Sequence, residues 1–493
     1  MHEGPLAGRY PAVAAMVVFA LVPYLALSAA LGPITPIIAG DLNMSLQAVA
    51  ITSGMANAGY AVGTVLAVQF AQKRPQRRML LVYGTLLLIG SVLTAAADSA
   101  AMFIIGHVLQ GLCTSLLLIA AVPPLITGYP AARLRETAVI MNVCIFGAVA
   151  LGPVLGGIQA SSNGWRPLFW AIAGVAAAAL VLSVLTFQDT PPVDPGAPID
   201  WIALSLAVIG CAAAFFGASE LLTHPFVDAT TIGPLLGGLL VIVILFVHEY
   251  TAKRPLLCVR SLISTLPVAG IVAAICAAAA SVSAISLTET VLAHRFSDMH
   301  LGLLYLPEFG GAVITAVTFG IVFRTRFLHY YVLVGLAFLA VGIAVMNAAS
   351  PPTSVLVGVG SGLVGIGVGS SVVPALFIAG FSLRSPQVQR VFAIVELIRA
   401  VAAFMIAPVL LYVAATVGSN ADAGTRTALW ICFWISITGG VIGVALYAAG
   451  GVRPPKPSVD AWMTGQQPGW YSPPLLTRLR RRGPSDEDVD ACP

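Results

Sequence analysis

Long apolar segments recur along the whole chain, and short polar loops separate them. Each segment is long enough to cross the hydrocarbon core of a membrane, which takes about 20 mostly apolar residues in a helix. Helix is the expected conformation because backbone groups in lipid need internal partners, and the runs lack the short alternating pattern of a membrane barrel. The pattern predicts fourteen membrane helices, at residues 11–37, 46–70, 79–97, 101–127, 137–160, 166–188, 201–222, 231–250, 265–292, 300–323, 328–348, 353–380, 388–415 and 426–450.

The composition does not fit a soluble core. Of the 493 residues, 58% are hydrophobic and only 9% are charged, whereas an ordinary soluble domain carries roughly 25% charged residues. Surface-to-volume scaling places polar residues on the outside of a soluble domain, and this chain has too few of them to cover one. The predicted fold class is therefore an all-α membrane protein.

Charge asymmetry across the predicted loops sets the orientation. Of the 24 lysines and arginines, only Arg166, Arg295 and Arg426 fall in one set of alternate loops, and Arg399 lies within a span. The others share the side of the N-terminus, and such an excess marks the cytoplasm. We therefore expect a multi-pass protein of the inner membrane with both termini in the cytoplasm. The first apolar run is too long for a signal peptide and is expected to remain as a span.

Two stretches of different composition interrupt the membrane pattern. A proline-rich connector follows the first six predicted helices, and the last residues are proline-rich and end in a basic run and then an acidic run. Such a tail has no apolar face to bury and is expected to be disordered. The predicted division is a cytoplasmic N-terminus (1–10), a six-helix bundle (11–188), a linker (189–200), two inserted helices (201–250), a loop (251–264), a second six-helix bundle (265–450) and a disordered cytoplasmic tail (451–493).

The segment at 137–160 contains the most specific motif of the chain, which is formed by Gly152, Pro153, Gly156 and Gly157. A proline inside a helix removes one hydrogen bond and kinks the helix. Paired glycines let a neighbouring backbone approach closely. These residues resemble the antiporter motif gxxxGPxxGG of the major facilitator superfamily, with Ala148 at the leading glycine. The alternative is a kink that serves packing alone.

Other segments extend the resemblance over about residues 11–450. Trp165, Arg166 and Phe169 open the next helix like the WRxxF segment that follows this motif in drug:proton antiporters. Two additional helices between the six-helix halves are similar to the fourteen-helix branch of that family. The resemblance implies a major facilitator fold in which two pseudo-symmetric bundles move around a midplane cavity.

The loop between the second and third helices departs from the family pattern GxLaDrxGrr. Gln69 and Gln76 replace its two glycines, and a lysine occupies the acidic position that latches the inner gate in the family. The candidate gate residues are therefore all basic, namely Lys73, Arg74, Arg77 and Arg78. Setting the topology is an alternative role for this cluster.

The fourth predicted helix carries His107, Gln110 and Gly111. They resemble the RxxQG segment of the family, in which the buried arginine is tied to proton coupling. An unperturbed histidine has a pKa of about 6.5, so His107 is a candidate to bind and release the coupling proton itself. The alternative is a neutral histidine that hydrogen-bonds Gln110 or another helix.

Few other ionisable groups lie within the spans, and such groups usually serve a purpose because burying a charge in lipid is unfavourable. Glu396 and Arg399 are three residues apart and share one helical face, which suits either an exchangeable pair or a structural ion pair. Glu289 and Glu308 are candidates for an outward proton or cation site, with exposure to the outer water boundary as the alternative. The candidates for hydrogen-bonding a substrate are Asn57, Tyr60 and Asn142.

The missing motifs narrow the function. The chain has no phosphate-binding GxxxxGK[ST] loop, no paired metal-ligand motif and no nucleophile elbow, and its basic residues follow the topology. We therefore expect no enzyme activity, no cofactor, no metal and no nucleic-acid partner. With these classes set aside, the resemblance implies a monomeric secondary active transporter in the bilayer that exchanges protons for small lipophilic or cationic drugs or metabolites. The alternatives are a facilitator, a lipid or siderophore exporter, and a non-transporting membrane scaffold or sensor.

Overall fold

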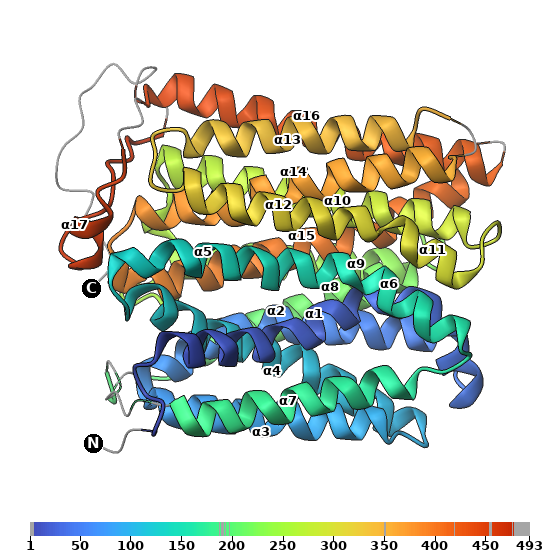
Figure 1. The fold of residues 1–493 in the computed structure, drawn as a ribbon, viewed down its shortest axis with the longest axis horizontal. Coiled ribbons are helices and arrows are strands. Elements are labelled where there is room, and N and C mark those ends of the chain that lie inside the picture. The colour runs from blue at the N-terminus through green and yellow to red at the C-terminus, as the bar shows by residue number, and fades with distance from the viewer. Residues whose placement is uncertain are drawn as a thin grey trace. The chain divides into compact units, whose positions relative to one another are not determined.

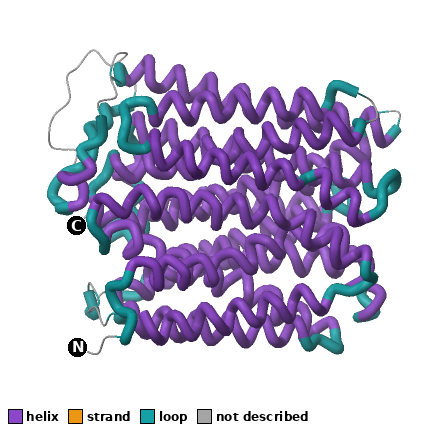
Figure 2. The backbone as a smooth tube through the Cα atoms, viewed as in Figure 1, coloured by secondary structure: helices purple, strands orange, loops and turns teal. Residues whose placement is uncertain are grey.

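The computed structural model describes residues 4–186, 188, 192, 194–196, 198–349, 352–418, 420–452, 456–475 and 477. In this part of the chain the secondary structure is helical, and strands are absent (Figure 2). Among the described residues, fourteen helices are long and apolar enough to cross a membrane. The prediction of an all-α fold with fourteen spans is thereby confirmed.

Figure 1 labels the helices, and most spans consist of a single one. The fifth, tenth and thirteenth spans are each built from several consecutive pieces. In chain order the elements are α1 (Tyr10–Asp41), α2 (Leu46–Lys73), α3 (Gln76–Ala95), α4 (Ala100–Thr127), η1 (Ala131–Arg133), α5 (Leu134–Asn142), η2 (Val143–Gly147), α6 (Ala148–Ser161), α7 (Arg166–Thr186), α8 (Trp201–Glu220), α9 (Ala229–Thr251), η3 (Arg260–Leu262), α10 (Thr265–Leu292), α11 (Asp298–Leu304), α12 (Leu306–Val322), α13 (Leu328–Met346), α14 (Ser354–Phe381), η4 (Ser385–Gln387), α15 (Val388–Thr416), α16 (Ala421–Gly450) and α17 (Val459–Met463).

Polar side chains fix where several spans begin. The first N–H groups of a helix lack partners within the helix, and a side-chain oxygen just before the helix can accept from one of them. Ser45 caps α2 in this way, Asp200 caps α8, Thr353 caps α14 and Asn420 caps α16. At the other end of α16, Gly451 adopts the left-handed conformation (φ 69°) that ends many helices.

The chain divides into two compact units. Unit 1 comprises the described residues of Met1–Gly128, Gly147–Leu245 and Glu289–Leu306. Unit 2 comprises those of Tyr129–Phe146, Phe246–Thr288 and Pro307–Pro493. This division differs from the predicted bundles in that unit 1 also holds residues up to Leu245 and Glu289–Leu306, and in that the two parts of the fifth span pack on different neighbours. Its second part, α6, packs on α1 and α11, while its first part, α5, packs on α14.

Corresponding helices have corresponding neighbours within each unit. In unit 1 the third span, α3, packs on α4 and α7. In unit 2 the eleventh span, α13, packs on α14 and α16. Because each triplet holds the third, fourth and sixth helices of its half of the chain, the packing follows the repeat expected from the sequence.

The first inserted helix, α8, is fastened to α2 at both ends within unit 1. At one end Gln47 Nε2 donates to Glu220 Oε2 over 2.8 Å. At the other end Gln69 Oε1 accepts from the backbone N–H of Asp200 over 2.9 Å. Close to the first of these bonds, a Cβ on Gly54 would overlap Ser219, so the helices also touch closely at that end. The inserted pair is therefore not a separate body, since α8 and most of α9 belong to unit 1.

The prediction of a disordered tail over 451–493 is wrong for residues 456–475. This stretch folds onto unit 2, where Trp462 and Trp470 are buried. Two large aromatic side chains give the segment the apolar surface that its average composition conceals. The basic and acidic runs at 478–493 lie outside the described residues.

Candidate functional site

The glycines of the fifth span contact two neighbouring helices of unit 1. A Cβ on Gly152 would overlap Ala29 of α1, and one on Gly156 would overlap the carbonyl of Ala30. On another face, a Cβ on Gly157 would overlap the carbonyl of Asp298 in α11. Pro153 is buried between these faces. The expected close approach of neighbouring backbones at this motif is confirmed.

Just before the motif, Val143–Gly147 forms a turn of π-helix. Such turns hold one residue more than an α-helical turn and occur frequently at functional sites. The division between the two units falls at Phe146 and Gly147, within this turn. The fifth span thus changes helical geometry at the place where its packing partners change.

Asn142 lies immediately before the π-turn and is committed to a helix contact in unit 2. Its Nδ2 donates to the carbonyl of Gly369 in α14 over 2.8 Å. Its Oδ1 is buried without a hydrogen-bond partner among the residues that the structure describes. A second contact lies nearby, since a Cβ on Gly320 of α12 would come within 2.8 Å of Val139. These contacts hold the first part of the fifth span against α12 and α14.

The fourth-helix motif lies in the core of unit 1. His107 is 1% exposed, and its Nδ1 lies 3.1 Å from Gln110 Oε1. Because Gln110 Nε2 donates to Ser91 Oγ of α3 over 3.1 Å, the amide oxygen faces the imidazole, and Nδ1 carries the proton of this bond. The ring packs against the aromatic rings of Tyr24, Phe103 and Phe169. The hydrogen bond to Gln110 expected for a neutral histidine is present.

Tyr24 of α1 contacts several of the predicted site residues, although it was not itself predicted from the sequence. Its hydroxyl donates to Asn57 Oδ1 over 2.9 Å, and its ring stacks on Tyr60 with centroids 6.1 Å apart. A Cβ on Gly111 would overlap the carbonyl of Ala56 in α2 and would come within 3.0 Å of the tyrosine hydroxyl. Asn57, Tyr60 and the α4 motif therefore share one polar and aromatic centre. The sequence feature that could have identified Tyr24 is the presence of a tyrosine in the middle of the apolar run at 11–37.

Glu289, near the end of α10, is assigned to unit 1 and faces α1. Its carboxylate oxygens lie 3.6 and 3.7 Å from the position that a Cβ on Gly32 would take. Oε1 is buried and has no hydrogen-bond partner in the described part of the chain. Pro36 has no N–H, so the carbonyl of Gly32 loses the donor that a regular helix would supply. The carboxylate with the unsatisfied oxygen therefore lies against the turn of α1 in which Pro36 removes one helical donor.

Glu396 and Arg399 form an ion pair within α15 of unit 2. Arg399 donates from Nε over 3.0 Å and from Nη2 over 2.6 Å, both to Glu396 Oε2. The two residues are 0% and 4% exposed. The guanidinium carbon lies 6.0 Å from the ring centroid of Phe146 in the π-turn. The structural ion pair considered for these residues is present, and it lies beside the fifth span.

Glu308 occupies the first turn of α12, where this helix packs on the glycine-rich α14. A Cβ on Gly365 would overlap the backbone carbonyl of Glu308, and one on Gly369 would overlap Thr315. The glutamate is 7% exposed. Its carboxylate is favoured there by the positive end of the helix dipole.

The loop with the four basic gate candidates is held by the two glutamines at the glycine positions. Gln69 binds the start of α8, as described above. Gln76 Nε2 donates to the carbonyl of Ala120 in α4 over 3.2 Å. This carbonyl needs an outside donor because Pro124, four residues later, has no N–H. Lys73 and Arg74 lie between these two anchors, at the end of α2, and Arg77 and Arg78 directly follow the second anchor at the start of α3.

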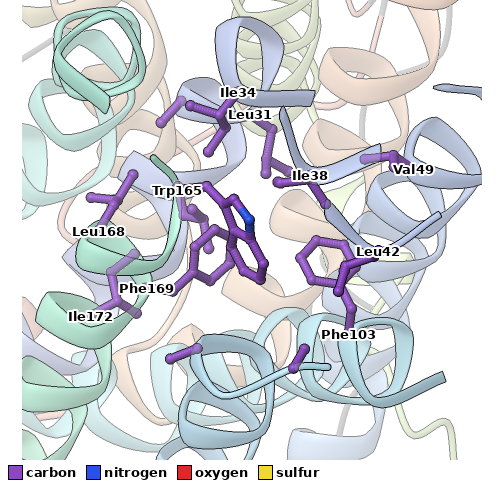
Figure 3. Close-up of a cluster of buried hydrophobic side chains, with 14 of the residues drawn as sticks. Leu31, Ile34, Ile38, Leu42, Val49, Phe103, Trp165, Leu168, Phe169 and Ile172 are labelled. Atoms are coloured by element: carbon purple, nitrogen blue, oxygen red, sulfur yellow. The ribbon is translucent and has the colours of Figure 1, made fainter. Parts of the chain in front are cut away.

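The segment that opens α7 closes an apolar cluster in unit 1 (Figure 3). Trp165 packs edge-on against Phe103 and Phe169, and its Nε1 donates to Asp41 Oδ2 over 2.9 Å. Arg166 bonds the same carboxylate oxygen over 2.8 Å and also donates to the carbonyl of Ala97. These contacts join the end of α1, the connection between α3 and α4, and the start of α7.

Comparisons with known proteins agree with this arrangement. The sequence model of the Major Facilitator Superfamily matches residues 17–363. The uncharacterized MFS-type transporter YubD of Bacillus subtilis (strain 168) is 26% identical over 248 residues, which are 47% of this chain and 46% of that protein. The multidrug resistance proteins MdtL of Shigella flexneri serotype 5b (strain 8401) and Escherichia coli O9:H4 (strain HS) are 30% identical over 164 residues, 33% of this chain and 41% of theirs. The chain thus matches less than half the length of these relatives.

Proposed function

Because the chain belongs to the Major Facilitator Superfamily, we propose that this multi-pass membrane transporter exports small lipophilic or cationic molecules in exchange for protons. The names of the MdtL relatives support the export of drugs. The alternating-access movement that this requires is supported by the fifth span, whose π-turn and Pro153 provide places to bend. We further propose that the protein acts as a monomer in the inner membrane, with both termini in the cytoplasm.

The observation that carries the proton coupling is the environment of Glu289. A carboxylate whose buried oxygen lacks a partner is stabilised by taking up a proton, and it is free to release that proton when water or a cation reaches it. The other candidates are bound more firmly. His107 is held by Gln110 and an aromatic shell, and Glu396 is paired with Arg399 on its own helix. We therefore place Glu289 first and keep His107, Glu308, Glu396 and Arg399 as further coupling candidates.

We propose that the transported molecule contacts the centre around Tyr24. This centre offers a hydroxyl, an amide and stacked rings in an otherwise apolar surrounding, which suits lipophilic molecules with a few polar groups. The amide of Asn57 is the least buried of these groups, since Tyr24 and Tyr60 are 1% and 0% exposed. Asn142, the third predicted contact, acts in this proposal through its bond to α14 rather than through the substrate.

Everted membrane vesicles with an imposed proton gradient and a fluorescent lipophilic cation test the proposal. Glu289→Gln keeps the shape of the side chain but cannot ionise, so we expect gradient-driven dye movement to be lost while dye binding remains. The matched control is Glu136→Gln, because Glu136 forms an exposed pair with Arg133. Gradient-driven transport at the wild-type rate in Glu289→Gln would refute the role of this carboxylate.

The same vesicles separate the alternatives. Dye movement that survives collapse of the gradient by an uncoupler would favour a facilitator over an antiporter. If the protein is normally folded but sealed vesicles move neither the dye nor lipid and siderophore substrates, this result would favour a scaffold or sensor.

A further inference from the structure

The C-terminal segment of unit 2 is built into the ends of several spans. Two tryptophans anchor it, since Trp462 and Trp470 are only 2% and 4% exposed. Trp462 Nε1 donates to the carbonyl of Leu383 over 2.9 Å and to that of Gly380 over 3.2 Å. Trp470 Nε1 donates to Ser382 Oγ over 2.9 Å. All of these acceptors lie at the end of α14.

This placement has a chemical reason. The last carbonyls of a helix have no partner within the helix, and a buried indole N–H needs an acceptor. At the end of α14 the indole N–H groups supply the donors that the last carbonyls lack, and the end of the helix supplies the acceptors that the indoles need. The backbone adds to the contact, because the carbonyl of Phe381 accepts from the N–H groups of Gly469 and Trp470 over 2.7 and 3.2 Å. Both indole rings also stand edge-on to the Phe381 ring, with centroids 5.1 and 5.8 Å away.

The same segment caps the start of α10. The carbonyl of Pro473 accepts from the N–H of Thr265 over 2.9 Å. Ser472 Oγ accepts from the N–H of Leu266 over 3.0 Å. These are among the first N–H groups of α10, which have no partner within the helix. One short stretch therefore satisfies the end of α14 and the beginning of α10 at once.

The segment also reaches the start of the fifth span and the loop after α12. Helix α17 contacts η1, which leads into α5. Asp460 lies 3.7 Å from Arg324 in the connection between α12 and α13. The first part of the fifth span is in turn held on α12 and α14 by Val139 and Asn142, as described above. The segment thus touches α14 and the loop that follows α12, the two helices on which this part of the span rests.

We propose that residues 458–474 form a strap that restrains the first part of the fifth span on unit 2. Release of the strap frees the ends of α10 and α14 and lets α5 leave α14 more often. By the predicted orientation this movement opens the transporter toward the cytoplasm, so the strap sets how readily that side opens. The inference rests on the alternating-access part of the proposed function and is independent of proton coupling.

Thiol labelling measures this movement without substrate or gradient. A variant without native cysteines carries Val139→Cys, which faces Gly320 in the closed contact. In the Trp462→Phe and Trp470→Phe double variant a phenyl ring replaces each indole, and both indole N–H groups are lost. We expect labelling of Cys at position 139 by a small maleimide to accelerate roughly tenfold, as for the loss of two hydrogen bonds of ordinary strength. Ser472→Ala, which removes one of the two acceptors at the start of α10, should accelerate it less.

Two controls separate a strap from general loosening. Trp434→Phe changes an exposed tryptophan of α16 and should leave the labelling rate unchanged. A second background keeps only Cys432, which is 0% exposed in α16 and should stay protected in every strap variant. The proposal is overturned by an unchanged rate at position 139. Equal acceleration at position 139 and at Cys432 overturns it as well, because the tryptophans then only stabilise the fold. Failure of dye transport with accelerated labelling refutes the proposed cargo and leaves the strap in place.

Discussion

In unit 1 the buried titratable side chain with a polar partner on α4 is His107, whose Nδ1 lies 3.1 Å from the amide oxygen of Gln110. In unit 2 the polar groups buried in α15 are Glu396 and Arg399, whose charged atoms lie 2.6 Å apart. Both centres use a partner three residues away on the same helix. The centre in unit 1 is an amide and imidazole network among aromatic rings, whereas the centre in unit 2 carries two compensating charges.

This difference indicates which substitutions each centre tolerates. An amide and imidazole network can lose one hydrogen bond for about 1 kcal/mol. An ion pair that loses one partner leaves an uncompensated charge in an apolar place, which costs about 3–5 kcal/mol. Unit 1 should therefore accept substitutions at its centre more readily than unit 2, provided that no charge is introduced.

The largest effect is expected from Arg399→Met. The variant removes the cation that is bonded to the carboxylate of Glu396 at 0% exposure and should lower the free energy of unfolding by about 3–5 kcal/mol. Thermal unfolding of the detergent-solubilised protein measures this change. The double variant Glu396→Leu with Arg399→Met removes both charges and should recover most of the loss. A double variant as unstable as Arg399→Met would show that lost packing, not the uncompensated charge, causes the loss of stability at this site.

The complementary change introduces a charge into unit 1. His107→Arg restores the residue of the family motif, but the described neighbours of the ring are aromatic groups and an amide. The buried guanidinium should lower the free energy of unfolding by about 3 kcal/mol. His107→Gln keeps a donor for Gln110 and should cost only about 1 kcal/mol. If both variants unfold at the same temperature, the centre of unit 1 already accommodates a charge.

Replacing a packing glycine by alanine should lower the free energy of unfolding by a similar amount in the two units. Gly111→Ala in α4 would overlap the carbonyl of Ala56, and Gly367→Ala in α14 would bring its Cβ within 2.6 Å of Leu339. Overpacking of this kind costs about 1–3 kcal/mol in each case. Gly174→Ala is the control, because its Cβ would meet no atom within 4 Å. Thermal unfolding of the three variants sharpens the comparison, since unequal losses at positions 111 and 367 would show that one unit repacks more easily.

The smallest effect is expected in the loop that carries the basic gate candidates. Gln76→Ala removes the donor to the carbonyl of Ala120 and should cost about 1 kcal/mol, because water can replace part of the bond. The bond joins uncharged groups, so the loss should be the same at low and high salt. A loss that shrinks with salt would indicate that the arginines, not the glutamine, hold the loop.

Local periodicity made much of this predictable. The spans follow from length and hydrophobicity because lipid leaves the backbone little choice. The contacts of His107 with Gln110 and of Glu396 with Arg399 follow from a spacing of three residues on a helix. Tyr24 and the strap were missed because their roles depend on which distant helices are neighbours. Trp462 in particular lies in a segment whose average composition indicates disorder, and only its acceptors at Gly380 and Leu383 explain its burial.

The π-turn at Val143–Gly147 also shifts the helical register of the fifth span between Asn142 and Ala148. It holds one residue more than an α-helical path would, and one residue corresponds to a rotation of about 100° around the helix axis. Removing that residue would turn the face with Gly152 and Gly156 away from α1 or the face with Asn142 away from α14. A single backbone irregularity thus lets one helix present the correct side to two different sets of neighbours.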